Sequence, residues 1–242
     1  MPLYRESGVV LRTIRLGEAD RIVTLLTEGR GKVRAVVKGV RKTKSRFGAR
    51  LEPLTHVALQ LYEGRELDTV TQAETIDNFR VIREDLDRVA RATALLEACD
   101  QVAQEGEPNA ALYRMLVGAL RSLAADSSPS LVSGFYWKLL ALEGFRPLLD
   151  VCATCGGGGP FVAFDLGEGG VLCRSCRKGL PVTEAALALV RRMLGGDLSS
   201  ALAEPPSAAT AEAEGLATRA MEHHLERRLR SARWPSLDPE RQ

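Results

Sequence analysis

Four of the five cysteines form two pairs with the same spacing. Cys152 and Cys155 make one Cys-x-x-Cys pair, and Cys173 and Cys176 make a second pair 17 residues later. Each pair places two sulfurs on one tight turn, and four thiolates complete a tetrahedron around Zn²⁺ with no open position for water. The spacing therefore predicts one closed, structural zinc site. An iron–sulfur centre and redox-active dithiols are the alternatives for these residue types.

The segment that carries these cysteines, about residues 151–180, has too few apolar side chains for a core of its own. The glycines of Gly156–Gly159 relieve steric limits on the turn after the first pair. Two short β-rich stretches, Phe161–Phe164 and Gly170–Leu172, are placed to bring the pairs together. The segment is predicted to be a zinc ribbon whose folding depends on the metal. The fifth cysteine, Cys99, lies among apolar residues and is predicted to be a core residue.

Positive charge is concentrated near the start of the chain. The net charge is +2, but the first 80 residues hold 15 Lys and Arg against 10 Asp and Glu. Within them the stretch Arg30–Arg50 contains nine basic residues and no acidic one. Such a patch suits a phosphodiester backbone, because Lys and Arg release condensed counterions on binding and need little sequence information. A solvated charged face is the alternative interpretation. Phe47 and Tyr62 are the nearby aromatics, so backbone contacts are expected to dominate over base stacking.

Residues for catalysis are not evident. The three histidines, His56, His223 and His224, stand apart from any Ser or Cys motif with a nucleophilic context and are predicted to be on the surface. The sequence contains no phosphate-binding GxxxxGK[ST] loop, GxGxxG fingerprint, GxSxG elbow or HExxH helix. The pattern favours a binding protein over an enzyme. No apolar run approaches the roughly 20 residues of a membrane span and no secretion signal is evident, so a cytoplasmic location is expected.

The elements that must position the basic residues are β-strands. Residues 55–62 alternate between apolar and polar side chains, which is the period of a half-buried strand. Residues 7–14, 21–27, 32–38 and 69–76 have similar composition, with glycines between them. Five short strands in about 80 residues predict a small closed barrel. Residues 39–53 are too many and too basic for a tight turn, and we expect an exposed loop or short helix there.

The remaining chain has the 3.6-residue period of helices. Apolar residues recur in this way from about residue 86 to 102, and again over 110–124, 131–143, 183–194 and about 209–230. The Ala/Glu/Pro-rich stretch 201–213 is expected to be a linker with a loosely capped helix start. The sequence thus predicts an α+β protein: a barrel domain over residues 1–80, then a helical domain over 81–242 that contains the four-cysteine zinc-ribbon insert at about 151–180.

Three separated segments carry a resemblance to known proteins. The first is Gly8–Thr27, with Gly31–Arg46 and Leu51–Leu54 after it; the second is Phe135–Pro147; the third holds the two cysteine pairs. Together they resemble the bacterial RecO recombination mediators, and they occur in that family's order over almost the whole chain, apart from residues 201–213 and the last residues. The resemblance implies that the barrel is an OB-fold and that the protein is not an enzyme. It places the DNA contact on Lys32, Arg34, Lys38, Arg41, Lys42, Lys44, Arg46 and Arg50.

The resemblance also implies a role in the RecF pathway of DNA repair and homologous recombination. RecO proteins bind single- and double-stranded DNA and anneal complementary strands. With RecR they help RecA to displace the single-stranded-DNA-binding protein SSB, whose acidic C-terminal tail they bind; a link to RecF and association with the nucleoid during repair are further expectations. The alternatives are a zinc-ribbon subunit of a nucleic-acid enzyme and a protein-scaffolding module whose basic patch binds acidic partners.

Overall fold

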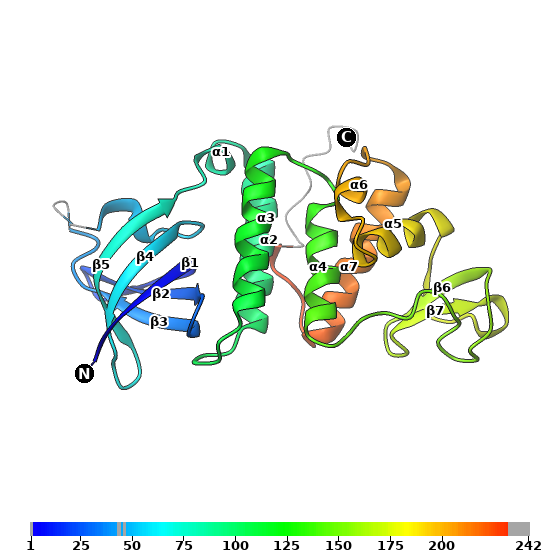
Figure 1. Cartoon of the computed structure of the whole chain (residues 1–242), viewed down its shortest axis with the longest axis horizontal. Coiled ribbons are helices and arrows are strands. Elements are labelled where there is room, and N and C mark those ends of the chain that lie inside the picture. The colour runs from blue at the N-terminus through cyan, green and yellow to red at the C-terminus, as the bar shows by residue number, and fades with distance from the viewer. Residues whose placement is uncertain (1, 43–44, 46, 232–242) are drawn as a thin grey trace. The chain divides into compact units, whose positions relative to one another are not determined.

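The computed structural model describes residues 2–42, 45 and 47–231 of the chain (Figure 1). They form two compact units that meet in the sequence between Ala125 and Asp126. The first unit contains the barrel and the three helices that follow it, and the second contains the cysteine-rich insert and four helices. None of the described helices combines the length and the apolar character needed to cross a membrane.

Five strands of the first unit form a closed barrel, drawn in blue to cyan in Figure 1. Their order around the barrel is β1-β2-β3-β5-β4, in which β3 and β5 run parallel and every other neighbouring pair is antiparallel. The fold is OB-like, as predicted. The strands are β1 (Leu3–Leu16), β2 (Asp20–Thr27), β3 (Gly31–Val37), β4 (His56–Tyr62) and β5 (Asp68–Asp77).

The barrel interior follows from the alternation along each strand. In β3 the residues Gly31, Val33, Ala35 and Val37 are buried, and the residues between them are half-buried. Because side chains of a strand point alternately to its two faces, the apolar set fills the interior and the basic set faces outward. The short 3₁₀ helix η1 (Gly48–Leu51) packs on β5 and places Leu51 in the barrel core.

Three helices follow the barrel in the first unit, and the last two cover part of its outer surface. The three helices are α1 (Arg80–Arg83), α2 (Leu86–Val102) and α3 (Ala110–Ala125). Asp85 caps α2 by accepting a hydrogen bond from the Arg88 amide. Helix α2 packs on β1, and α3 packs on β1 and β2. The predicted core residue Cys99 is fully buried on α2, which raises the pKa of its thiol.

The second unit surrounds the most apolar helix, α4 (Leu131–Leu142), which packs against α5 (Glu184–Leu194) and α7 (Ala208–His224). In the sequence, α4 and α5 are separated by a three-stranded sheet with the strand order β7-β6-β8. Its members are β6 (Phe161–Asp165), β7 (Gly170–Cys173) and β8 (Leu180–Pro181), with the 3₁₀ helix η2 (Arg174–Cys176) after β7. Phe164 of β6 lies against Trp137 of α4, with ring centroids 5.9 Å apart.

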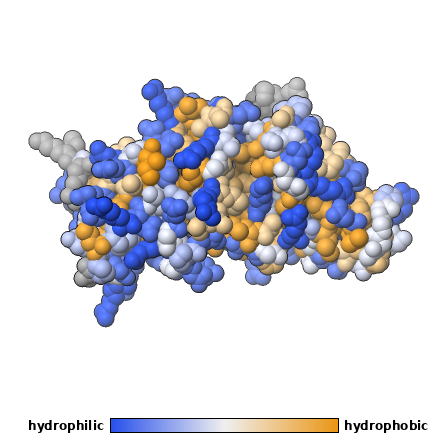
Figure 2. Space-filling view, in the orientation of Figure 1, coloured by the Kyte–Doolittle hydropathy of each residue, from blue (hydrophilic) through white to orange (hydrophobic). Residues whose placement is uncertain are grey.

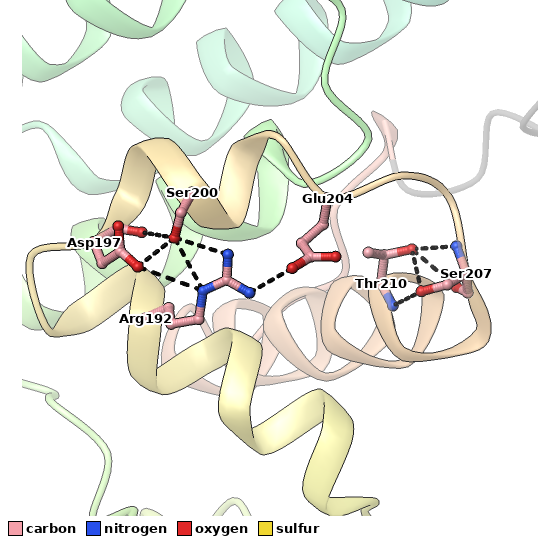
Figure 3. A network of polar contacts seen from close by, with 6 residues as sticks. All are labelled: Arg192, Asp197, Ser200, Glu204, Ser207 and Thr210. Atoms are coloured by element: carbon pink, nitrogen blue, oxygen red, sulfur yellow. Dashed lines mark hydrogen bonds and ion pairs between the residues drawn. The ribbon is translucent and has the colours of Figure 1, made fainter.

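The linker predicted over residues 201–213 is shorter than expected: residues 203–207 connect two helices, and the helix start expected in this stretch is present at residue 208. A further helix, α6 (Leu198–Leu202), precedes α7, and Arg192 of α5 holds the turn between them (Figure 3). The Arg192 guanidinium donates to the Glu204 carboxylate at 2.6 Å and to the Ser200 hydroxyl at 2.8 Å. A capping box of Ser207 and Thr210 starts α7. These polar contacts stabilise the segment. The spacing of its apolar residues does not reveal them.

Candidate metal centre and nucleic-acid interface

The four predicted metal ligands meet in one cluster. The sulfurs of Cys152, Cys155, Cys173 and Cys176 all lie within 4.8 Å of one another. The first pair precedes β6, and the second spans the end of β7 and η2, so the β6–β7 hairpin brings the two pairs together. The spacing predicted this cluster, and the structure confirms that the four residues converge.

The turn that carries the first pair is fixed by backbone hydrogen bonds. The Gly156 amide donates to the Cys152 carbonyl and the Cys152 amide donates to the Gly157 carbonyl, both at 2.8 Å. Gly156 has φ +72°, a region that glycine enters without steric cost. The Cys173 amide also points at the Cys152 sulfur, 3.5 Å away. Backbone N–H groups of Cys173 and Cys155 lower the pKa of Cys152 to about 6, which favours a thiolate.

The geometry of the cluster fits a metal ion better than a disulfide. The Cys155 and Cys173 sulfurs are 3.9 Å apart, whereas a disulfide requires about 2.05 Å. A tetrahedral Zn–S distance of about 2.3 Å corresponds to sulfurs about 3.8 Å apart. Cys176 resists ionisation beside the other thiols: hydrogen bonds with the Cys155 and Cys173 sulfurs raise its pKa to about 12. A divalent cation at their centre would remove that conflict, since all four ligands bind as thiolates.

The basic residues of the barrel divide into two groups. Lys32 and Arg34 lie on the outward face of β3, where acidic residues meet them: Lys32 Nζ lies 3.8 Å from an Asp100 carboxylate oxygen, and Arg34 lies 3.6 Å from Glu105. Lys38, Arg41 and Lys42 follow β3 and are exposed, as is Arg50 on η1. The predicted residues Lys44 and Arg46 lie outside the described residues.

Arg41 fixes the exposed group beside the turn between β1 and β2. Its guanidinium donates to the carbonyl oxygens of Gly17, at 3.3 Å, and Glu18, at 2.9 Å. The Gly39 amide also donates to the Asp20 carboxylate at 2.7 Å. Lys38 and Lys42 therefore extend from a backbone that the barrel anchors. In Figure 2, hydrophilic residues cover much of the barrel surface in this view, with small hydrophobic areas between them.

The two aromatic residues near the patch differ in exposure. Phe47 is 2% exposed and belongs to the barrel core, whereas Tyr62 at the end of β4 is 46% exposed. A shallow cavity of about 460 Å³ opens beside Phe47, and Arg50, Thr75 and Asn78 contribute to its walls. The burial of Phe47 excludes base stacking on its ring, whereas the ring of Tyr62 is accessible.

Comparison with known proteins identifies the family. Residues 1–79 match the family described as Recombination protein O N terminal, and residues 83–233 match Recombination protein O C terminal. The chain belongs to the RecO family. It is 45% identical over 237 residues to the DNA repair protein RecO of Frankia casuarinae, covering 96% of this chain and 97% of that protein. It is 47% identical over 240 residues to the RecO of Nocardioides sp. (95% and 97%), and 45% over 246 residues to that of Streptomyces coelicolor (97% and 99%).

The division between the two RecO family matches, near residue 80, falls where the barrel strands end and the helices begin. All four cysteines of the cluster lie within the second match. Membership of the RecO family supports a role in DNA repair for this protein.

His56 of this RecO chain is not on the surface, which corrects the prediction for that histidine. It is 5% exposed on β4, and its Nε2 lies 2.7 Å from the Tyr113 hydroxyl on α3. Burial, with the nearby positive charge of Arg121, lowers its pKa. His56 therefore helps to join the barrel to α3. Its apolar neighbours in β4 give no sign of this partner, which lies 57 residues away in the sequence.

Sequence reasoning also missed the acidic partners of the β3 cations. Asp100 near the end of α2 binds Arg12 of β1, with Nε and Oδ2 2.6 Å apart. Nothing local marks Asp100, because its partner lies 88 residues away in the sequence. The available signal is the strand register: Arg12 and Arg34 both stand opposite Thr24, so the two arginines lie in one row across the sheet.

Proposed function

We propose that this RecO family protein binds single- and double-stranded DNA through its barrel and anneals complementary strands without catalysing a covalent step. With RecR it would help RecA to replace SSB on single strands during RecF-pathway repair, acting in the cytoplasm and at the nucleoid, with a link to RecF. The observation that carries this proposal is the group of exposed cations on an anchored segment beside the OB-like barrel. The family's role in DNA repair supplies the context.

The proposed contact consists of Lys38, Arg41, Lys42 and Arg50, together with Lys44 and Arg46. Four phosphate contacts would make log affinity for single strands fall with log salt at a slope of roughly −3. Neutralised phosphates also permit two strands to approach, since repulsion acts within a Debye length of about 10 Å at 0.1 M salt. Phosphate neutralisation is therefore a physical basis for annealing. Lys32 and Arg34 differ from this group, because they form ion pairs with Asp100 and Glu105.

The four-cysteine cluster is proposed to hold one structural Zn²⁺. Four thiolates leave no position for water or substrate, so the ion would supply folding free energy rather than chemistry. The small core cluster beside the cysteines is consistent with this role, because its buried residues are Cys152, Ala163 and Leu172, while the buried Phe164 packs against Trp137 of α4. Elemental analysis that finds about one zinc per chain, and none in a Cys176→Ser variant, would support it; iron would favour the iron–sulfur alternative.

The SSB tail requires an apolar site beside a basic group, because that tail combines an aromatic residue with carboxylates. Trp137 and Phe135 of α4 are buried and do not offer one. Leu142, Phe145 and Leu148, after the buried part of α4, are 40–58% exposed, and the exposed Arg146 lies among them in the sequence. We place the proposed contact there. Phe145→Ala is expected to weaken binding of an SSB tail peptide, and unchanged binding would exclude this placement.

The central experiment measures DNA binding and annealing by fluorescence anisotropy and strand-pairing assays. The variant Lys38→Gln/Lys42→Gln removes two cations of the proposed contact. Its control, Arg114→Gln/Arg219→Gln, removes two exposed cations from α3 and α7. We expect the first variant to bind single strands at least tenfold more weakly, with a shallower salt slope, and the control to resemble the wild type. Equal affinities for the two variants would refute the proposed contact.

The same assay separates the alternative functions. A wild-type protein that binds an acidic peptide but no DNA would be a scaffolding module. Covalent change of the DNA strands during the assay would indicate an enzyme subunit. Annealing without nucleotide consumption or strand cleavage is the result expected of the non-catalytic protein.

A further inference from the structure

Three cations share the outward face of the barrel near α2. Arg12 of β1 and Arg34 of β3 stand in one row across the sheet, because both are register partners of Thr24 on β2. Lys32 lies two residues before Arg34 and therefore on the same face. On charge alone this row would extend the proposed DNA contact of Lys38, Lys42 and Arg50 along β3.

Two acidic side chains, Asp100 and Glu105, form ion pairs with the cations of that row. Asp100 bridges two of the cations: its Oδ2 is 2.6 Å from Arg12 Nε, and its Oδ1 is 3.8 Å from Lys32 Nζ. Its carbonyl oxygen also accepts a hydrogen bond from Lys32 Nζ at 2.7 Å. Glu105 Oε1 lies 3.6 Å from the third cation, Arg34. The Asp100 and Lys32 side chains are only 13% and 15% exposed, so these charges are shielded from solvent.

The backbone holds one of the acids in place. The loop between α2 and α3 runs along the start of β3: the Lys32 amide donates to the Gln104 carbonyl at 3.1 Å, and the Gly106 amide donates to the Lys32 carbonyl at 3.2 Å. Gly31 permits this approach, because a Cβ at that position would lie 1.8 Å from the Glu107 carbonyl oxygen. These backbone contacts hold the segment that carries Glu105 beside β3.

These contacts leave hydrogen-bonding capacity unused. Arg34 Nε and Asp100 Oδ1 are buried without a hydrogen-bond partner among the described residues, as are His56 Nδ1 and Trp137 Nε1 elsewhere in the fold. Groups assembled only for stability are usually satisfied when buried. A carboxylate beside Lys and Arg occupies the position that a phosphate oxygen would take, since both are anions that accept from the same donors.

We propose that Asp100 and Glu105 act as built-in competitors of DNA phosphates. They prevent DNA phosphates from binding to Arg12, Lys32 and Arg34. DNA therefore binds to the neighbouring cations Lys38, Lys42 and Arg50. The two acids are thus positioning residues for the DNA path, acting through the cations they hold. This inference rests on the proposed DNA binding by the barrel.

The test is the salt dependence of single-strand binding, measured by anisotropy with a fluorescent oligothymidylate. The variants are Glu105→Gln and Asp100→Asn/Glu105→Gln. Freed cations can bind further phosphates, so the log–log slope should steepen by about 0.7 for each additional phosphate bound, up to about 2 for the double variant. Its affinity at low salt should rise on the order of tenfold. Adding Arg34→Gln to Glu105→Gln should cancel the effect of the single variant.

A matched control separates this effect from a general change in charge. Glu74→Gln/Asp87→Asn removes the same two charges from exposed positions on β5 and α2, where no ion pair is formed with another described residue. A double variant that only matches this control would overturn the inference. Glu105 is 52% exposed, so Glu105→Gln keeps the test valid if Asp100→Asn unfolds the barrel in a thermal scan.

The outcomes also distinguish this inference from the function on which it rests. If the wild type binds no DNA, the proposed function fails. If the wild type binds and Lys38→Gln/Lys42→Gln weakens binding, but the acid variants match their control, only the role of Asp100 and Glu105 is refuted.

Discussion

Phe164 is expected to anchor the cysteine-rich ribbon to the helices of the second unit. It is 2% exposed on β6, and its ring packs against the 1% exposed Trp137 of α4. Truncating a buried Phe to Ala costs about 3–5 kcal/mol, and a tilted aromatic pair adds about 0.5–1.5 kcal/mol beyond area burial. Phe164→Ala should therefore destabilise the second unit by about 4 kcal/mol, because neighbouring groups cannot fill the space of a ring in a close-packed core.

The assay for this prediction is urea unfolding, combined with hydrogen exchange to separate the two units. Peptides from α4 and β6 should lose protection in Phe164→Ala, while the barrel strands keep theirs. Phe145→Ala is the control, because Phe145 is 58% exposed, with its ring centroid 4.2 Å from that of His224. It should change stability by under about 0.5 kcal/mol. A loss below about 1 kcal/mol in Phe164→Ala would show that the ribbon is held without this contact.

Three further predictions concern the metal, pH and a helix cap. Chelation, or Cys176→Ser, should abolish amide protection of β6 and β7 while sparing the barrel, because metal binding contributes on the order of 10 kcal/mol in zinc modules; protection that survives chelation would contradict a structural metal. Burial lowers the pKa of His56. As the pH falls below about 6.5, His56 becomes protonated in the unfolded chain before it does in the folded unit, so the free energy of unfolding should decrease. Above that pH, His56 should not change the free energy of unfolding. His56→Gln should flatten that dependence in urea titrations, and an unchanged slope would argue against His56 as its source. Ser207→Ala should cost about 1 kcal/mol by removing the cap of α7, measured by urea unfolding, and a neutral result would show that the cap is dispensable.

The parts of this molecule that were predictable are those encoded by nearby residues. Alternation along residues 55–62 predicted β4, and the glycines between apolar stretches predicted the joins of the barrel. Two equal Cys-x-x-Cys spacings predicted the convergence of the four sulfurs, because each pair shares one turn. The OB-like identity of the barrel came from the resemblance to RecO proteins, since a period of two residues does not specify strand order.

The parts that were not predictable depend on partners far away in the sequence. Asp100 sits on α2 with no local feature to show that Arg12 and Lys32 would meet it. His56 has the same difficulty, because Tyr113 comes from a different element. Helix α6 escaped detection for another reason: five residues are too short for a helical period, and side-chain contacts of Arg192 secure the turn after it.

The hydrogen bonds between β3 and the loop after α2 have a consequence for exchanging parts among RecO proteins. Strands β3 and β5 pair only at Ala35–Asp68 and Val36–Thr69, while residues 104–106 bond to the first part of β3. A fragment cut at residue 80 would leave those backbone groups as an unprotected sheet edge, which invites strand addition from another molecule. It would also strip the helices from β1 and β2. A chimaera that receives this barrel must also receive residues 81–125, so the smallest transferable unit is larger than the barrel itself.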